Sequence, residues 1–442
     1  MSKAVHRPPR VGLISPCGGG NLGDAAILDA MIEGVRSRTA DAEFFAMTFN
    51  PQDTERRHRI PAFRLTAERY VLSEETLAGW CARRSVTQRL YSLRWLRPIL
   101  RLFLRALYFA ASLRNELRHF VSGLGLAKGA DLMVVAGGGQ LDDYWGGAWS
   151  HPYNLFKWGC IARVAGTPVV VLSVGYGTKP SRFSRVFLRT ILRMSAYNSF
   201  RDPRSASLAH EWLGEPQPIV VPDLAFGLPV KSAQRAPARK TVIGISPIAF
   251  AHPRWWPQKD AALYDAYIGR LAQFVDWLGV QGHELVLFCT DTMDVHCVRD
   301  LYERCTARTN IVTNDAARPL PYYKDVEELI AQLAPLDMVV ASRLHGVILA
   351  HRLAKPVLAI SYDWKVDVHM QQVGESDNVL DIGTMNAAAL IARFTRLAQR
   401  RVEIERKLRD TARGFGQQVS GQFDRVADQF LRRPAPSPVT RS

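Results

Sequence analysis

The chain has 442 residues, of which 47% are hydrophobic and 22% are charged, with 10 tryptophans, 13 tyrosines and 19 phenylalanines. This composition excludes a disordered or low-complexity chain, and the length is typical of two folded domains with sizeable cores. Lysine and arginine outnumber the acids by 57 to 41, which gives a net charge of +16 and favours anionic partners. The six cysteines form no C-x-x-C pair, so neither a thiolate zinc centre nor a disulfide framework is expected.

Short apolar runs alternate with helical patterns along the chain, which is typical of parallel sheets with crossover helices. In the first half, the expected strands are residues 11–15, 43–49, 131–136, 168–174, 196–200 and 219–221. In the second half, they are residues 241–248, 284–290, 310–313, 337–342, 356–361 and 378–382. The sequence therefore predicts the α/β class, with two parallel-sheet domains of similar size.

The expected domain boundaries lie where this alternation stops. We expect an N-terminal parallel-sheet domain at 1–228, a polar linker with two prolines at 229–240 and a C-terminal parallel-sheet domain at 241–385. A helical segment at 386–431, with Asn386 as its N-cap, and a disordered Pro/Ser tail at 432–442 follow. No apolar signal segment precedes the first strand, so a cytoplasmic location is expected.

A basic helical insertion without a strand pattern is expected at about 60–128 in the first domain. Residues 83–128 hold ten lysines and arginines against one acid. Four arginines recur there at helical spacing, opposite apolar residues: Arg94, Arg97, Arg101 and Arg105. The apolar stretch is too short and too interrupted by arginine to span a bilayer. Two interpretations stay open: a helix lying on an anionic membrane surface, or a packed helix with a solvated arginine face.

A glycine-rich turn follows the first expected strand at residues 17–25 (CGGGNLGDA) and opens a helix. Glycines such as Gly19 and Gly20 let the backbone approach a ligand, and a helix N-terminus presents free N–H groups to an anion. Three glycines fit G-x-G-x-x-G, but the second strand does not end in the acidic residue that a dinucleotide site requires. Asn21 and Asp24 are also unusual in a pyrophosphate loop. NAD binding is therefore disfavoured, and a purely structural turn is the alternative.

A second glycine triplet follows the third expected strand in residues 134–147 (VVAGGGQLDDYWGG), which contain Gly138, Gly139 and Asp142. Because the carboxyl ends of parallel strands meet at one edge of a sheet, we expect both glycine-rich turns to face the same ligand. Carboxylates beside flat aromatic rings suit a sugar, whose hydroxyls donate hydrogen bonds and whose C–H face stacks on a ring. A simple turn is the alternative for either loop taken alone.

Charged residues end three further strands. Arg201 closes one in SFRDPRSAS, where Arg204 is expected at a solvated helix start, and Asp223 ends another in VPDLAF. In SRLHG, Arg343 ends a buried strand and His345 begins a helix. An arginine and a histidine at a strand end and a helix N-terminus favour anion binding over a purely structural histidine.

The ordered set of motifs resembles the polysaccharide pyruvyl transferase family. The matching segments cover about residues 11–373: GGGNLGDA, AGGGQLDD, SFRDPRSAS, VPDLAF and SRLHG, followed by KPVLAISYDWKV. The resemblance implies two Rossmann-like domains in a glycosyltransferase-B-like arrangement, with the site in the cleft between them. It implies a transferase that moves pyruvate from phosphoenolpyruvate to two hydroxyls of one sugar, as a cyclic ketal, during surface-polysaccharide or exopolysaccharide assembly. It also implies that phosphoenolpyruvate meets Arg343 and His345, and Arg201 in the preceding domain.

On this interpretation the candidate residues divide into catalytic and binding groups. We expect Arg343 and Arg201 to hold the phosphate and carboxylate of phosphoenolpyruvate, and His345 to protonate its methylene carbon. Either Asp142 or Asp24 takes the proton of the sugar hydroxyl, and the sequence does not choose between them. The other expected substrate-binding residues are Gly19, Gly20, Asn21, Gly138, Gly139 and Asp223.

The expected partners are phosphoenolpyruvate as the donor, a sugar or lipid-linked oligosaccharide as the acceptor, and an anionic membrane surface. Neither a metal nor a cofactor is expected, and the location expected is the cytoplasm, with peripheral contact to the inner face of the membrane. Nucleic acid is not expected, because the charge lies on helices without interleaved aromatics and no zinc-finger or RNP pattern occurs. Two other functions stay open: a glycosyltransferase with a nucleotide-sugar donor, and a non-enzymatic basic membrane protein of polysaccharide assembly.

Overall fold

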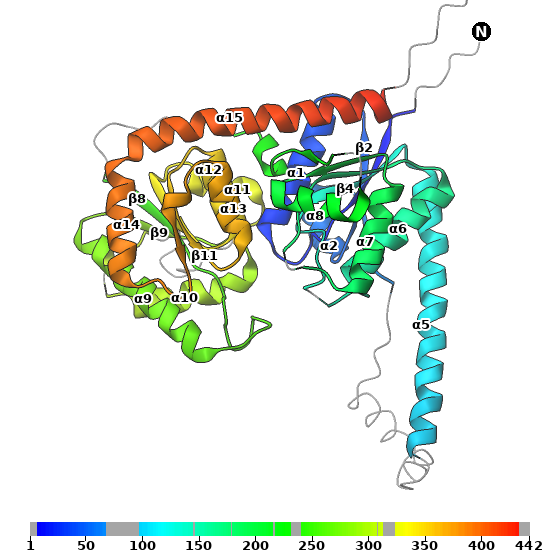
Figure 1. Cartoon of the computed structure of the whole chain (residues 1–442), viewed down its shortest axis with the longest axis horizontal. Helices are drawn as coiled ribbons and strands as arrows, with labels where there is room; N and C mark the ends of the chain where they lie inside the picture. The colour runs from blue at the N-terminus through cyan, green and yellow to red at the C-terminus, as the bar shows by residue number, and fades with distance from the viewer. Residues whose placement is uncertain are drawn as a thin grey trace, which may run out of the picture.

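Two parallel sheets form the framework of the computed structural model, and helices cover both of them (Figure 1). The structure describes residues 7–67, 97–144, 146–177, 179–214, 217–230, 240–306, 308–312 and 323–432. In the helix that begins at Arg97, side chains are described from residue 110 onward. The expected α/β class with two parallel-sheet domains is confirmed.

The first sheet has seven strands in the order β3-β2-β1-β4-β5-β6-β7, and neighbouring strands run parallel. The strands are β1 (Arg10–Ile14), β2 (Glu43–Thr48), β3 (Ala62–Arg64), β4 (Leu132–Gly138), β5 (Val169–Val174), β6 (Tyr197–Phe200) and β7 (Ile219–Val220). The helices are α1 (Leu22–Arg36), α2 (Pro51–His58), α5 (Arg97–Lys128), α6 (His151–Ala165), α7 (Arg182–Met194), α8 (Pro203–Leu213) and η1 (Leu224–Gly227).

The second sheet has five parallel strands in the order β12-β11-β10-β8-β9. They are β8 (Val242–Ser246), β9 (Glu284–Leu287), β10 (Met338–Ala341), β11 (Val357–Ser361) and β12 (Val379–Asp381). The longer helices are α9 (Ala261–Val280), α10 (Val295–Arg304), α11 (Val326–Leu333), α12 (Leu344–Arg352), α13 (Trp364–Gln372), α14 (Ala387–Gln399) and α15 (Arg401–Val426). The short ones are η2 (Thr292–Asp294), η3 (Arg308–Asn310), η4 (Ser376–Asn378) and η5 (Ala427–Leu431).

Successive strand residues point to opposite faces of each sheet, and a different core covers each face. On β4, Leu132, Val134 and Ala136 belong to the core that contains α1, whereas Met133 and Val135 belong to the core that contains α6 and α7. The core on the α1 side continues into the face of the second sheet that α11 and α12 cover. The two domains therefore share a hydrophobic core where they meet.

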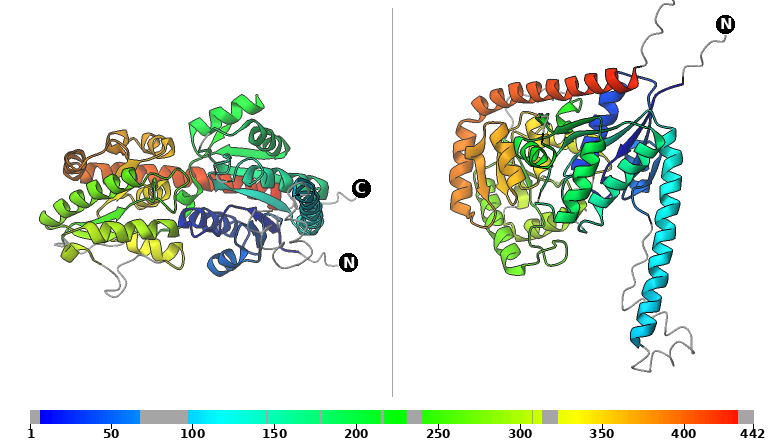
Figure 2. Two further views of the ribbon diagram at one scale, coloured as in Figure 1. Left: turned by 90° about the horizontal axis from the view of Figure 1, so that it is seen from below. Right: turned by 45° about the vertical axis from the view of Figure 1, so that its right-hand side comes forward.

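The helix α15 connects the two domains a second time, because it runs back from the second sheet across the first (Figures 1 and 2). Near its end, the buried ring of Phe423 packs against Gly34 of α1. Arg38 Nε donates a hydrogen bond to Asp424 Oδ1 at 2.7 Å beside this contact. At the other end of the segment, Asn386 caps α14 by accepting a hydrogen bond from the backbone N–H of Ala389, as expected.

Two strand predictions are wrong, and both concern very short segments. Residues 62–64 form β3 at the edge of the first sheet, although the insertion was expected to contain no strand. The expected strand at 310–313 makes, in its described part, one isolated bridge between Ile311 and Leu285. Three residues, or a single bridge, are too few for a two-residue periodicity to be read from the sequence.

The helix α5 extends away from the first domain (Figures 1 and 2). Near its C-terminus it packs on α6, where Lys157 Nζ donates a hydrogen bond to Glu116 Oε2 at 3.0 Å. In the part of the chain that the structure describes, no helix is both long and apolar enough to cross a membrane. Arg94, the side chains of Arg97, Arg101 and Arg105, most of the expected linker and the expected tail lie outside the described residues.

Candidate active site

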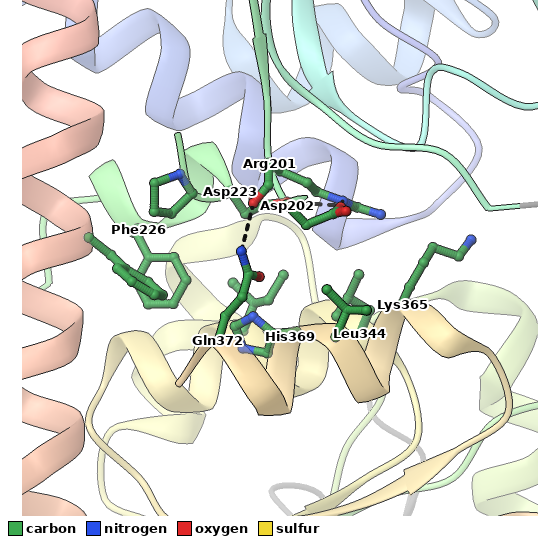
Figure 3. A pocket seen from close by; sticks show the side chains of 12 residues that line it. Arg201, Asp202, Asp223, Phe226, Leu344, Lys365, His369 and Gln372 are labelled. Carbon is green, nitrogen blue, oxygen red and sulfur yellow. Dashed lines mark hydrogen bonds and ion pairs between the residues drawn. The ribbon is translucent and has the colours of Figure 1, made fainter. Parts of the chain in front are cut away.

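A cavity of about 820 Å³ opens between the two domains, at the carboxyl ends of the strands of both sheets. Seven of the expected site residues line it: Asn21, Asp24, Gly139, Asp142, Arg201, Arg343 and His345. Asp223 lies behind the cavity and lines a second, much smaller space together with Arg201 (Figure 3). Gly19 and Gly20 lie in the loop after β1 and Gly138 is the last residue of β4, and all three are outside the lining. The sequence therefore located the edge of the sheets at which the cleft lies.

The first glycine-rich loop forms a backbone junction with the second domain. The N–H of Leu22 donates to the carbonyl of Thr290 at 2.7 Å, and the N–H of Thr292 donates to the carbonyl of Gly20 at 3.3 Å. Gly20 has φ +86°, and a Cβ added to it would lie 2.2 Å from Oγ1 of Thr292. The close backbone approach expected for this loop is therefore an approach to the other domain. Asn21 accepts a hydrogen bond from the N–H of Gly23 at 2.8 Å and caps α1.

His345 lies in the first turn of α12, against the N-terminus of α1. A Cβ added to Gly23 would lie 2.0 Å from its Nδ1, so only glycine leaves room for the ring here. On the other side, His345 Nε2 lies 3.7 Å from Oδ2 of the buried Asp223. Burial opposes ionisation of Asp223, but His345, Arg201 and the N–H of Ala225 together lower its pKa to about 2. An ionised carboxylate therefore lies beside the imidazole.

Two carboxylates on the first-domain side of the cavity are poised to accept protons. Burial raises the pKa of Asp24, and Asp223 adds to this shift while His345 opposes it. Burial also raises the pKa of Asp142, against the positive charge of Lys365. A partly buried carboxylate with a raised pKa, open to a cavity, is suited to act as a catalytic base. Asp24 and Asp142, the two carboxylates expected as candidates for the base, both have this raised pKa.

The guanidinium of Arg343 is held by two aspartates of the second domain. Its Nε donates to Asp294 Oδ2 at 2.6 Å and its Nη2 donates to Asp294 Oδ1 at 3.1 Å. Nη2 also lies 3.4 Å from Asp291 Oδ2. Asp294 is fully buried and accepts a further hydrogen bond from the N–H of Ala249 at 2.8 Å. These contacts fix the position of Arg343 at the cavity wall and balance its charge.

Arg201 is similarly enclosed, at the end of β6. Its Nη1 lies 3.4 Å from Asp223 Oδ2, and its Nε lies 3.7 Å from Asp202 Oδ2. From the second domain, Gln372 Nε2 donates to the carbonyl of Arg201 at 3.2 Å, as Figure 3 shows. A Cβ added to Gly175 would lie 2.3 Å from Nε of Arg201, so the glycine leaves room for the guanidinium. Arg201 thus ties the end of β6 to both neighbouring loops and to α13.

A tryptophan from the second domain closes over the first at the cavity rim. Trp364 Nε1 donates to the carbonyl of Gly177 at 2.5 Å, and its ring lies 4.7 Å from that of Tyr176. The guanidinium carbon of Arg204 lies 4.2 Å from the Trp364 ring centre. Arg204 is exposed at the start of α8, as expected, but its side chain also lines the cavity.

Metal and thiol chemistry have no evident centre in the described ranges. No three His, Cys, Asp or Glu side chains gather there in a way that could hold a metal ion. Burial raises the pKa of the Cys17 thiol to about 12, so it stays protonated at neutral pH. The titratable side chains that line the cavity are its carboxylates, arginines, lysines, tyrosines and His345.

The family is decided by comparison with known sequences. A family model described as polysaccharide pyruvyl transferase matches residues 21–363, which is most of the chain. This chain belongs to that family. Membership makes it a transferase that acts on a sugar or polysaccharide. No curated protein matches the sequence.

Solved structures resemble this pyruvyl transferase family member at low sequence identity. The protein in the S. aureus MnaA–UDP co-structure is 11% identical to this chain, with a TM-score of 0.57. The match covers 97% of this chain and 99% of that chain. UDP-GlcNAc 2-epimerase from Neisseria meningitidis, bound to UDP-GlcNAc, is 11% identical over 95% of this chain and 100% of that chain, with a TM-score of 0.54. A glycosyltransferase from Rickettsia africae is 8% identical over 97% of this chain and 100% of that chain, with a TM-score of 0.51. These similarities show that the chain has the glycosyltransferase-B-like fold.

Sequence reasoning missed several residues that complete the site of this pyruvyl transferase family member. Asp291 and Asp294 follow β9, and the rule that selected Asp223 at another strand end could have selected them too. Trp364 and Lys365 lie in the motif KPVLAISYDWKV, which was matched without a role for either residue. Their contacts depend on the first domain, and no local pattern in the sequence reports such contacts.

Proposed function

We propose that this protein transfers pyruvate from phosphoenolpyruvate to two hydroxyls of one sugar, which yields a cyclic ketal and inorganic phosphate. Family membership supports a transferase that acts on a sugar or polysaccharide. The observation that carries the proposal is His345, which lies between the ionised Asp223 and the N-terminus of α1 and faces a cavity that Asp24 also lines. Addition of a hydroxyl to an enol phosphate requires an acid for the methylene carbon and a base for the hydroxyl, and His345 and Asp24 line the same cavity.

The proposed reaction begins with a proton passing from His345 to the methylene carbon of phosphoenolpyruvate, which makes C2 electrophilic. A sugar hydroxyl then attacks C2 and gives its proton to a carboxylate. Asp24 is the carboxylate we propose, because it lies on the same helix turn that contacts His345. The C2–O bond to phosphate breaks, the second hydroxyl attacks C2, and its proton leaves with the phosphate. The proton on Asp24 then returns to His345, which restores both groups for the next turnover. Atoms and charges balance without a metal or a redox cofactor.

The test replaces His345 by glutamine. We expect phosphate release from phosphoenolpyruvate to fall by about 10²–10⁴-fold, because a general acid contributes that much. The acceptor is a glycan extract from a strain that lacks the gene, and mass spectrometry of the product detects the added pyruvate. The matched control is His283→Gln, since His283 precedes β9 at the opposite end of the sheet. Near-normal turnover of H345Q would show that another group is the acid.

A glycosyltransferase with a nucleotide-sugar donor is the second candidate, and the size of the cavity favours it. About 820 Å³ is more than phosphoenolpyruvate alone occupies, and the wall includes the aromatic residues Phe250, Trp256 and Tyr362. In the pyruvyl transferase proposal, this extra space holds the acceptor. The two candidates differ in their products, because one releases inorganic phosphate and the other a nucleotide. Analysis of the released phosphate compounds in a single reaction separates them.

We further propose that α5 places the protein on an anionic membrane surface, where a lipid-linked acceptor would be found. Leu113, Leu117 and Val121 recur every four residues on α5 and are 50%, 60% and 67% exposed. Arg114 and Arg118 are exposed on the same turns. Apolar side chains flanked by arginines suit the interface between acyl chains and anionic headgroups.

The membrane proposal is tested by co-sedimentation with vesicles. Wild type should bind vesicles that contain phosphatidylglycerol and not those of phosphatidylcholine alone, and L113S/L117S/V121S should lose most of this binding. Val280→Ser is the control, because Val280 is 80% exposed at the end of α9 in the second domain. If the triple variant binds vesicles as wild type does, or if it instead changes a dimer into a monomer in light scattering, the apolar residues serve another purpose.

A further inference from the structure

The positive charges that line the cavity differ in whether an acid already balances them. Five cations line it: Lys179, Arg201, Arg204, Arg343 and Lys365. Three of these have aspartate partners: Asp294 and Asp291 contact Arg343, Asp223 and Asp202 contact Arg201, and Asp363 lies 3.3 Å from Lys365. For Arg204 and Lys179, no carboxylate among the described residues lies within ion-pair distance. The uncompensated positive charge of the cleft is therefore concentrated on these two residues of the first domain.

Arg204 is held in a way that leaves its charged edge open. Its guanidinium lies over the ring of Trp364 at 4.2 Å, and its Nε donates to the hydroxyl of Tyr176 at 3.1 Å. In the described part of the chain, neither of its two terminal nitrogens has a hydrogen-bond partner. Trp364 is itself fixed, because its Nε1 donates to the carbonyl of Gly177. A guanidinium that is stacked on one face and open at its edge is arranged for two parallel hydrogen bonds to an anion.

We propose that Arg204, positioned by Trp364 and Tyr176 and assisted by Lys179, binds a phosphate group in the cleft. Arg343 and Arg201 cannot supply this charge to the same degree, because aspartates already neutralise them. The phosphate belongs either to the donor, phosphoenolpyruvate, or to a diphosphate that links the acceptor sugar to its carrier. The choice between these two sources of the phosphate rests on the proposed function. The presence of a phosphate site at Arg204 does not depend on that function.

Calorimetric titration of Arg204→Met tests the proposal with two ligands, phosphoenolpyruvate and inorganic pyrophosphate. Methionine keeps the apolar stem on Trp364 and removes the charge. We expect at least about a tenfold loss of affinity for one of the two ligands, since a charge-assisted hydrogen bond is worth that much. Lys179→Met should lose less. Arg189→Met is the matched control, because Arg189 is an exposed arginine of α7 outside the cavity lining.

The positioning role of Trp364 has its own test. Trp364→Phe keeps an aromatic face under Arg204 and should keep most of the affinity, whereas Trp364→Leu should lose it. If Trp364 had only a structural role, the Phe and Leu variants would bind the ligands with equal affinity whenever their thermal stabilities were equal. That result would remove Trp364 from the site.

The two ligands separate the outcomes. Weaker binding of phosphoenolpyruvate by R204M places the donor phosphate at Arg204, and weaker binding of pyrophosphate alone places a diphosphate of the acceptor there. Binding of pyrophosphate by wild type without any binding of phosphoenolpyruvate would contradict the proposed function and leave the phosphate site intact. If R204M and K179M bind both ligands as wild type does, the phosphate site is wrong.

Discussion

The contact between Gly23 and His345 gives the most direct test of how the two domains make one site. Replacing Gly23 by alanine adds a Cβ that would lie 2.0 Å from Nδ1, 2.2 Å from Cγ and 2.6 Å from Cβ of His345. Because ordinary contact begins at 3.4 Å, the two helices must separate by about 1.4 Å at the closest atom. Rotation of the ring alone does not relieve this contact, since the Cβ of His345 is also too close. The substitution therefore moves His345 relative to Asp24 without removing either group.

A displacement of about 1 Å at a reacting group costs on the order of 100-fold in rate, or roughly 2.7 kcal/mol of transition-state stabilisation. We expect G23A to lose about that much kcat/KM for phosphate release from phosphoenolpyruvate. Stability should fall by about 1–2 kcal/mol, because overpacking costs about 1–3 kcal/mol and alanine is favoured over glycine in a helix by up to about 1 kcal/mol. Gly414→Ala in α15 is the control, since a Cβ there meets nothing within 4 Å. If G23A keeps more than half of wild-type kcat/KM, the closed contact is not the active geometry.

Three further predictions concern buried groups, and urea denaturation measures each. Burial raises the pKa of Asp24 in the folded state, so its stabilising contribution exists at low pH and is lost as pH rises through that pKa. Asp24→Asn should therefore be more stable than wild type at pH 7. The difference in stability between the two proteins should disappear towards pH 4. The pKa of Asp223 is lowered to about 2, so its contribution is present above the unfolded-state value and lost as pH falls towards 2. Asp223→Asn should lose about 2 kcal/mol at pH 7 and much less near pH 2. Phe423→Ala should lose about 3–5 kcal/mol, while the exposed Val402→Ala loses almost nothing. If Phe423→Ala and Val402→Ala lost equal amounts of unfolding free energy, α15 would not hold the first domain.

Most strands and helices of the fold could be predicted from the sequence because their signals are local. Apolar runs of five to seven residues mark strands that are buried on both faces, such as β4 and β5, and these were predicted correctly. Helix caps such as Asn386 were also local and were predicted correctly. The return of α15 to the first domain was not predictable in this way. It depends on Phe423 meeting Gly34 almost 400 residues earlier in the chain.

In the candidate site, too, local features could be predicted from the sequence and contacts between distant segments could not. The carboxyl ends of parallel strands meet at one edge, so residues such as Asp142, Arg201 and Arg343 could be placed near each other from sequence order alone. Their partners could not. Arg343 was expected to be available to a substrate, yet Asp294 at the end of η2, 49 residues earlier, holds two of its nitrogens. Which charge is balanced by which neighbour is a property of the assembled cleft.

The charge of the cleft is opposite to that of the chain. Against the five lining cations stand four lining carboxylates, Asp24, Asp142, Glu211 and Asp363, and four aspartates that contact Arg201 and Arg343 from behind. With His345 neutral, these described groups sum to three negative charges, although the whole chain carries +16. General attraction by a basic protein therefore cannot explain how an anionic donor would be held. Local pairing must do so, and protonation of His345 would reduce the imbalance.

Binding of phosphoenolpyruvate should therefore take up a proton. The bound anion adds negative charge to a cleft that already has an excess of it, and the ionised Asp223 lies 3.7 Å from His345 Nε2. Calorimetry at pH 7 in two buffers of different ionisation enthalpy measures the number of protons bound. Uptake should be present in wild type and in D24N and absent in H345Q, because His345 is the group that becomes charged. If H345Q takes up as many protons as wild type, a carboxylate is neutralised instead, and His345 cannot be the acid that the donor recruits.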